Sequence, residues 1–67
     1  MRPQRFGTVL RTLRQRGGMT QDELAKRAKV TKPYLSQLET GIRKNPSLPV
    51  LKRLAKALGV PVTALLE

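Results

Sequence analysis

The sequence contains no cysteine, no histidine and no tryptophan, and its only aromatic residues are Phe6 and Tyr34. Without thiols and imidazoles, disulfides are excluded, and a zinc site or a hydrolase that pairs a nucleophile with histidine lacks its usual residues. Apolar runs span only a few residues, far fewer than a membrane helix or the apolar core of a signal peptide needs. We therefore expect a cytoplasmic chain that has no metal ion or other cofactor and is not an enzyme.

Acidic residues are scarce too, because only 4 oppose 14 lysines and arginines, which leaves a net charge of +10. A balance this basic favours a polyanionic partner such as nucleic acid. Hydrophobic residues make up 39% of the chain, enough for a modest core, which argues against a disordered basic tail. The 67 residues have room for one such core, so we expect a single domain over residues 1–67.

The apolar residues recur at the spacing of a helix and nowhere alternate as in a strand. Phe6, Val9, Leu10 and Leu13 form one stripe, which predicts a helix from about residue 3 to residue 16. Similar stripes and end signals predict four further helical segments, over about residues 20–28, 31–40, 47–58 and 61–66. The expected fold is therefore all-α, a compact bundle of about five short helices.

Residues at the ends of these segments support the boundaries. Thr20 and Glu23 have the spacing of a capping box, in which a hydroxyl and a carboxylate satisfy N–H groups at the start of a helix. Thr31 is the expected N-cap of the third helix. Gly41 is expected to end that helix in a left-handed conformation, with Ile42 folding back as an apolar contact.

The segments within about residues 20–40 have the features of a helix-turn-helix. Their connection, Lys29–Val30, is tight, and Ala25 is short enough to let two helices cross closely. On a helical projection of residues 31–40, the side opposite the leucines holds Lys32, Pro33, Ser36, Gln37 and Thr40. Small polar residues beside a lysine and a glutamine suit the base edges of a major groove, whereas a merely solvated face more often carries Glu and Lys. Cations are expected around this face from Lys26, Arg27, Lys29, Arg43 and Lys44.

In these segments the chain resembles the phage-repressor and Cro type of helix-turn-helix regulators, the XRE family. The resemblance extends from Leu10 to Leu66 and is carried by residues 19–25 (MTQDELA), 30–31 (VT), 34–41 (YLSQLETG), 45–48 (NPSL) and 54–60 (LAKALGV). It implies a lambda-repressor-like DNA-binding domain.

The resemblance also implies roles for individual positions. Base-edge contacts are expected from Lys32, Pro33, Ser36 and Gln37. Phosphate contacts are expected from Gln21, Thr31, Thr40, Arg43, Lys44 and Asn45. A structural ion pair that links the first and third helices is expected between Arg14 and Glu39. Lys29 stands where the family often has a turn glycine, which predicts a strained left-handed backbone there.

We interpret the chain as a sequence-specific transcriptional regulator of double-stranded DNA, in particular a repressor, that reads the major groove with residues 31–40. A homodimer on a palindromic operator is the family expectation, because one short helix reads few base pairs alone. One other interpretation stays open, an antitoxin-type interaction module that also binds DNA, which would need a partner-binding segment. A non-specific cationic binder would need charge on every face, and the polar side of residues 31–40 argues against it. Neither a membrane partner nor a small-molecule ligand is indicated.

Overall fold

The computed structural model describes residues 5–43 and 46–66. Within these residues the chain forms helices and no strand, in the order α1 (Arg5–Arg16), α2 (Gln21–Ala28), α3 (Lys32–Thr40), α4 (Leu48–Leu58) and α5 (Val62–Leu66). The predicted all-α fold of five short helices and its approximate boundaries are confirmed. The predicted start of the first helix, at residues 3 and 4, lies outside the described residues.

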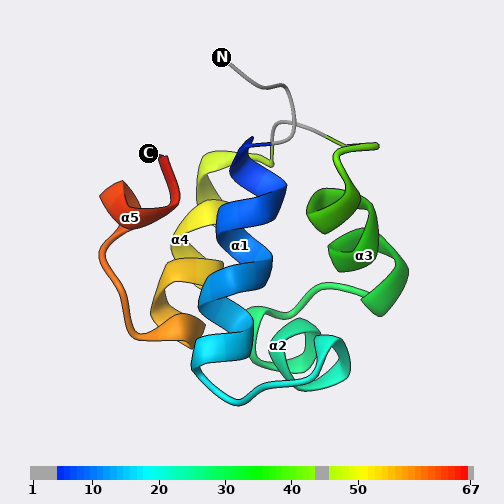
Figure 1. Ribbon diagram of the computed structural model, residues 1–67, viewed down its shortest axis with the longest axis horizontal. Helices are drawn as coiled ribbons and strands as arrows, with labels where there is room; N and C mark the ends of the chain where they lie inside the picture. Colours follow the sequence, from blue (N-terminus) through cyan, green and yellow to red (C-terminus); the bar gives the residue numbers. More distant parts are fainter. Residues whose placement is uncertain (1–4, 44–45, 67) are drawn as a thin grey trace.

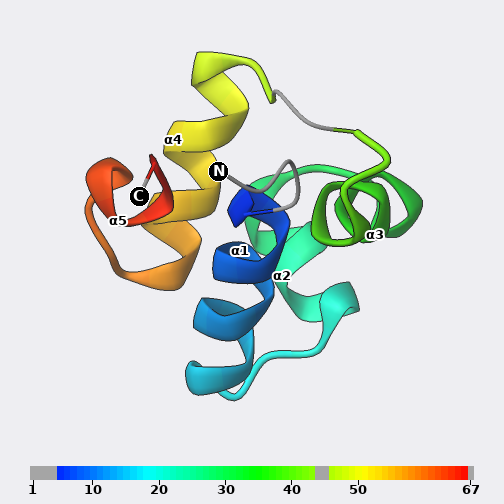
Figure 2. The same ribbon diagram turned by 45° about the horizontal axis from the view of Figure 1, so that its top comes forward.

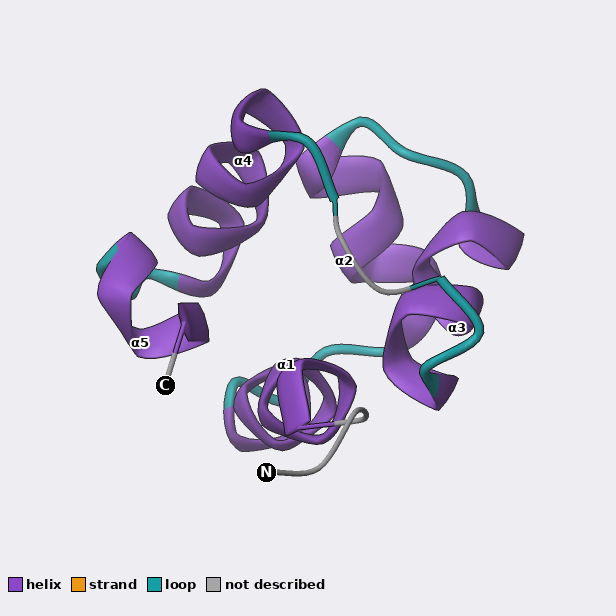
Figure 3. Cartoon of the chain, turned by 90° about the horizontal axis from the view of Figure 1, so that it is seen from above, coloured by secondary structure: helices purple, strands orange, loops and turns teal. Residues whose placement is uncertain are grey.

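Helix α1 lies at the front and centre of Figure 1, with the other helices beside and behind it. Helices α4 and α5 lie on one side of it and α3 on the other, and α2 lies near its C-terminal end, as the turned view in Figure 2 also shows. Helix α1 packs against α3 and α5, and α2 packs against α3 and α4, within a body of 29 × 23 × 22 Å. Seen from above, α3 lies at the edge of the molecule, with one side turned away from the other helices (Figure 3).

The core consists almost entirely of leucine and alanine side chains. All five helices contribute to its fully buried leucines, which are Leu10, Leu24, Leu35, Leu38, Leu54 and Leu65. Phe6 and Leu13 of the predicted stripe on α1 are half-buried against this core. Burying one leucine contributes about 1.5–3 kcal/mol. Because helices this short are marginal in isolation, packing on this core is what holds α3 in its helical form.

Capping side chains begin three of the helices. The Thr20 hydroxyl accepts from the Glu23 N–H at 3.1 Å, and the Thr20 N–H donates to the Glu23 carboxylate at 2.9 Å, so the predicted capping box is confirmed. The backbone hydrogen bond from Thr20 lowers the pKa of Glu23, which favours a charged carboxylate at the positive end of α2. Thr31 and Ser47 cap α3 and α4 through their hydroxyl oxygens.

The end of α3 differs from the prediction. Gly41 is left-handed (φ 87°) as expected. Ile42, however, is 77% exposed, so the predicted apolar contact back onto the helix is wrong. The loop is held instead by a backbone bond in which the Arg43 N–H donates to the Gln37 carbonyl at 3.1 Å. The α3 end is therefore fastened by polar contacts on its outer side.

The turn between α2 and α3 contains the left-handed residue expected from the family resemblance. Lys29 has φ 60° and ψ 44°, a conformation that costs an L-residue about 1–2 kcal/mol. The turn holds nevertheless, because the Val30 N–H donates to the Ala25 carbonyl at 2.9 Å. Arg53 of α4 adds a bond from its Nε to the Ala28 carbonyl at 2.8 Å. These contacts hold the turn on the end of α2 and tie it to α4.

The backbones of α1 and α3 approach closely at Gly7, a contact that was not predicted. A Cβ atom at Gly7 would lie 2.5 Å from the carbonyl oxygen of Leu38 and 2.6 Å from that of Glu39. Both oxygens belong to the backbone of α3, so neither can move aside as a flexible side chain could. Glycine at this position therefore sets the distance between α1 and the C-terminal end of α3.

Candidate nucleic-acid interface

The outer side of α3 carries the residues predicted to contact base edges. Lys32 and Pro33 are exposed and Ser36 and Gln37 are half-buried, whereas the leucines on the opposite side of the helix are fully buried. Pro33 lies in the first turn of α3, where its missing N–H leaves no helical bond unmade. These four residues thus share one face of α3, the helix that lies at the edge of the molecule in Figure 3.

Gln37 is held by two residues that follow it. Its side-chain Oε1 accepts a hydrogen bond from Arg43 Nε at 3.2 Å, and its backbone carbonyl accepts from the Arg43 N–H at 3.1 Å. The Thr40 hydroxyl also donates to that carbonyl, at 3.3 Å. The Arg43 guanidinium lies over the ring of Tyr34, with its Cζ atom 5.1 Å from the ring centre, within the range of a cation–π interaction. Arg43 is therefore folded back onto the side of α3 that carries Tyr34 and Gln37.

Tyr34 was not among the predicted site residues. It precedes Gln37 by three positions, so the two side chains are neighbours on the surface of α3. Its ring is half-buried against the core on one side and supports Arg43 on the other. The spacing to Gln37 is visible in the sequence, but the position of Arg43 depends on the course of the loop, which no local pattern reveals.

Two of the residues predicted to contact phosphates, Thr31 and Thr40, differ in whether the hydroxyl proton already has a partner within the protein. The Thr31 hydroxyl oxygen accepts the N-cap bond of α3, which leaves its own proton free to donate. The Thr40 hydroxyl proton is already donated to the Gln37 carbonyl, so a phosphate contact there requires a change of partner. The remaining predicted pair in the loop, Lys44 and Asn45, lies outside the described residues.

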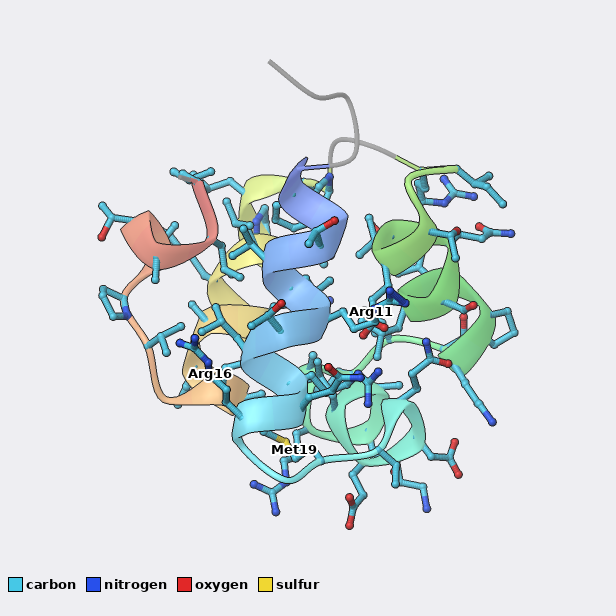
Figure 4. All side chains as sticks on the ribbon, viewed as in Figure 1. Arg11, Arg16 and Met19 are labelled. Atoms are coloured by element: carbon cyan, nitrogen blue, oxygen red, sulfur yellow. The ribbon has the colours of Figure 1, made fainter. Side chains whose placement is uncertain are left out.

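The predicted pair of Arg14 and Glu39 is confirmed. Arg14 Nε donates to Glu39 Oε2 at 2.7 Å, and Arg14 Nη2 donates to Glu39 Oε1 at 3.1 Å. The two side chains are 11% and 1% exposed. Arg14 also donates from Nη1 to the Met19 carbonyl at 2.8 Å. Met19 lies in the turn between α1 and α2 (Figure 4). Every buried side-chain nitrogen and oxygen among the described residues has a hydrogen-bond partner, so the burial of this pair is compensated.

Gln21, the first residue of α2, joins this pair. Its Nε2 donates to Glu39 Oε1 at 3.0 Å, a contact that the sequence did not predict. An amide nitrogen carries two N–H donors, so one remains for the predicted contact with a phosphate. Glu39 thereby connects α1, the start of α2 and α3, and it fixes Gln21 relative to the outer face of α3.

The cations are spread over more than one side of the molecule. Arg27 and Lys29 line a depression of about 380 Å³ together with Arg53 and Lys56 of α4. Both residues therefore lie beside α4. On α1, Arg11 points toward the side of α3 and Arg16 points away from it (Figure 4).

The described residues form neither a cluster of metal ligands nor a membrane span. Within residues 5–43 and 46–66, no three acidic side chains come together as the ligands of a metal ion would. In the same part of the chain, no helix has both the length and the apolar character needed to cross a membrane.

Two helices joined by a tight turn, the second at the edge of the molecule with a polar outer side, define the helix-turn-helix class. The sequence matches the helix-turn-helix family over residues 10–65. The chain therefore belongs to this family.

Known proteins agree with this assignment. The HTH-type transcriptional regulator DdrOP3 of Deinococcus deserti is 48% identical over 58 residues, which cover 87% of this chain and 44% of that protein. The immunity repressor protein of Bacillus phage phi105 is 37% identical over 59 residues, which cover 88% and 40%. This chain thus spans less than half the length of either relative. The resemblance to phage repressors is confirmed.

A solved structure supports the same fold. The crystal structure of SinR, a master regulator for biofilm formation, in complex with DNA superposes with a TM-score of 0.89 at 35% identity. The match covers 92% of this chain and 98% of that chain.

Proposed function

We propose that this chain acts as one DNA-binding unit, over residues 1–67, of a cytoplasmic transcriptional regulator that represses its targets. The observation that carries the proposal is the outer face of α3, a helix at the edge of the molecule, on which Lys32, Ser36 and Gln37 lie opposite the buried leucines. A net charge of +10 and a family that includes a regulator solved with DNA support the same function. The role is binding, not catalysis.

In this proposal, phosphates supply affinity and α3 supplies sequence preference. Helix α3 enters the major groove, and its four outer residues, Lys32, Pro33, Ser36 and Gln37, contact base edges. The phosphates on either side are contacted by Gln21, Thr31, Thr40, Arg43, Lys44 and Asn45. Lysine suits the acceptor atoms of guanine, and an amide can pair with both hydrogen-bonding atoms of adenine.

We further propose that the regulator binds a palindromic operator as a homodimer. Helix α3 has 9 residues, and its first turns offer only a few side chains to the bases. A second copy related by a two-fold axis doubles the number of bases read, which is how helix-turn-helix regulators reach longer sites.

Replacing Gln37 by alanine should weaken binding to the preferred operator by roughly 1–3 kcal/mol, because a base-edge contact is lost. Binding to an unrelated duplex should change much less, since phosphate contacts dominate there. The preference at one base pair of each half-site should also disappear. Titration of the preferred and unrelated duplexes with parent and variant measures both effects.

Gln15 supplies the matched control, because it is an exposed glutamine on α1. Gln15→Ala should leave both affinities unchanged. Equal losses by Gln37→Ala on the preferred and unrelated duplexes would show that Gln37 reads no base.

A further inference from the structure

We propose that Arg43 is a positioning residue for base recognition, which fixes the Gln37 amide in one orientation and so sharpens the base preference at the pair that Gln37 reads. The inference rests on the proposed function of α3 and adds to it a residue outside the helix that controls specificity. It is carried by the hydrogen bonds and the ring contact that join Tyr34, Gln37 and Arg43.

The first step concerns the orientation of the amide. The end of a glutamine side chain carries an acceptor, Oε1, and a donor, Nε2, and a half-turn of the amide exchanges them. Arginine has only donors, so the atom of Gln37 that faces Arg43 Nε at 3.2 Å must be the acceptor Oε1. With Arg43 in place, the amide therefore has one favoured orientation before DNA is bound.

The second step concerns what holds Arg43. Its backbone N–H donates to the Gln37 carbonyl at 3.1 Å, so the start of its side chain is fixed relative to α3. Its guanidinium lies 5.1 Å from the centre of the Tyr34 ring, which is itself half-buried against the core. Arg43 is thus anchored at both ends of its side chain to the helix that carries Gln37. A side chain held in this way loses less entropy when it binds than a free one.

The third step separates two roles of the same residue. Only the Nε donor of Arg43 is used on Gln37, which leaves the Nη donors of an exposed guanidinium for a phosphate. The charge contributes to affinity on any duplex, whereas the Nε bond affects the choice of base. A substitution that keeps the charge and removes Nε therefore isolates the second role.

Arg43→Lys is that substitution, because lysine keeps the charge but has no planar group and no Nε donor. The Gln37→Ala variant first identifies the base pair that Gln37 reads. The measured quantity is then the affinity for the preferred operator divided by the affinity for an operator changed at that base pair. We expect this ratio to fall by about two- to tenfold, the range expected for one side chain that is no longer pre-oriented. The slope of log affinity against log salt should stay at the parent value, whereas Arg43→Ala should make it shallower by about 0.9.

Tyr34 provides an independent pair of variants that leaves the charge unchanged. Tyr34→Leu removes the ring under Arg43 and should lower the same ratio, whereas Tyr34→Phe keeps the ring and should preserve it. Thermal melts of each variant establish that the domain is folded at the temperature of the titrations.

An unchanged ratio in Arg43→Lys would overturn the inference while leaving the proposed function intact. Equal falls in the ratios at every base pair of the operator would also overturn it, because they would indicate a general loss of docking. A parent protein without any preferred duplex would overturn both the inference and the proposed function.

Discussion

Replacing Arg14 by alanine should destabilise the protein by about 3–5 kcal/mol, the usual cost of removing one partner of a buried ion pair. The variant leaves the Glu39 carboxylate, which is 1% exposed, with Gln21 as its remaining side-chain donor. A domain of this size without disulfides or a metal ion rarely has more than about 3–5 kcal/mol of stability in total. Arg14→Ala should therefore be largely unfolded at 25 °C, as measured by circular dichroism in urea titrations.

Two further variants test the reason for this loss. Arg16 is an exposed arginine in the same helix, so Arg16→Ala should change the stability by no more than about 0.5 kcal/mol. The double variant with Arg14→Met and Glu39→Leu removes both charges and should recover most of the stability lost in Arg14→Ala. A cost below about 1 kcal/mol for Arg14→Ala would contradict the structural role of the pair.

Replacing Gly7 by alanine should also destabilise the protein, by about 1–3 kcal/mol. Alanine in place of glycine normally stabilises the interior of a helix by roughly 0.5–1 kcal/mol, so the expected sign is the reverse of the usual one. The reason is the position of the new methyl group, 2.5 Å from the Leu38 carbonyl oxygen, which would push α1 away from α3. Chemical denaturation of parent and variant measures the difference.

Gly17 is the matched control for this substitution. A Cβ atom there would meet the flexible end of the Met19 side chain at 3.1 Å and backbone oxygens only at 3.5 Å. Gly17→Ala should therefore cost much less than Gly7→Ala. Similar losses of stability in the two variants, or a gain of stability in Gly7→Ala, would show that this contact does not set the distance between α1 and α3.

The helices could be predicted because their signals are local. Thr20 with Glu23, and Thr31 at the start of α3, mark helix starts by side chains that reach only three residues along the chain. The left-handed backbone at Lys29, in contrast, was expected only from the resemblance, because Lys29 stands where the family often has a turn glycine. Packing of the leucine stripes then follows from their spacing.

Contacts between distant segments were harder to predict. The pair of Arg14 and Glu39 was expected only from the resemblance to a known family, and the participation of Gln21 was not expected at all. Nothing in the local sequence around Gly7 shows that another helix crosses there. Such contacts depend on where two helices meet, which their separate periodicities do not determine.

The loop after α3 shows a different kind of error. Gly41 followed by Ile42 has the pattern of an apolar helix end, yet Ile42 is exposed and polar contacts from Arg43 take its place. The position of Arg43 depends on Tyr34 and Gln37 of α3. Tyr34 offers a ring and Gln37 an acceptor to the same guanidinium. The roles of individual residues at the DNA remain predictions.

Selection of bound duplexes from a random library by the parent protein tests the central claim most directly. The account predicts an enriched sequence with two half-sites related by a two-fold axis, their centres about 34–36 Å apart or a multiple of that distance. The protein should bind this sequence at least about 10³-fold more tightly than an unrelated duplex at physiological salt. A library that shows no enrichment, or equal affinity for selected and unrelated duplexes, would contradict the claim that α3 reads a DNA sequence.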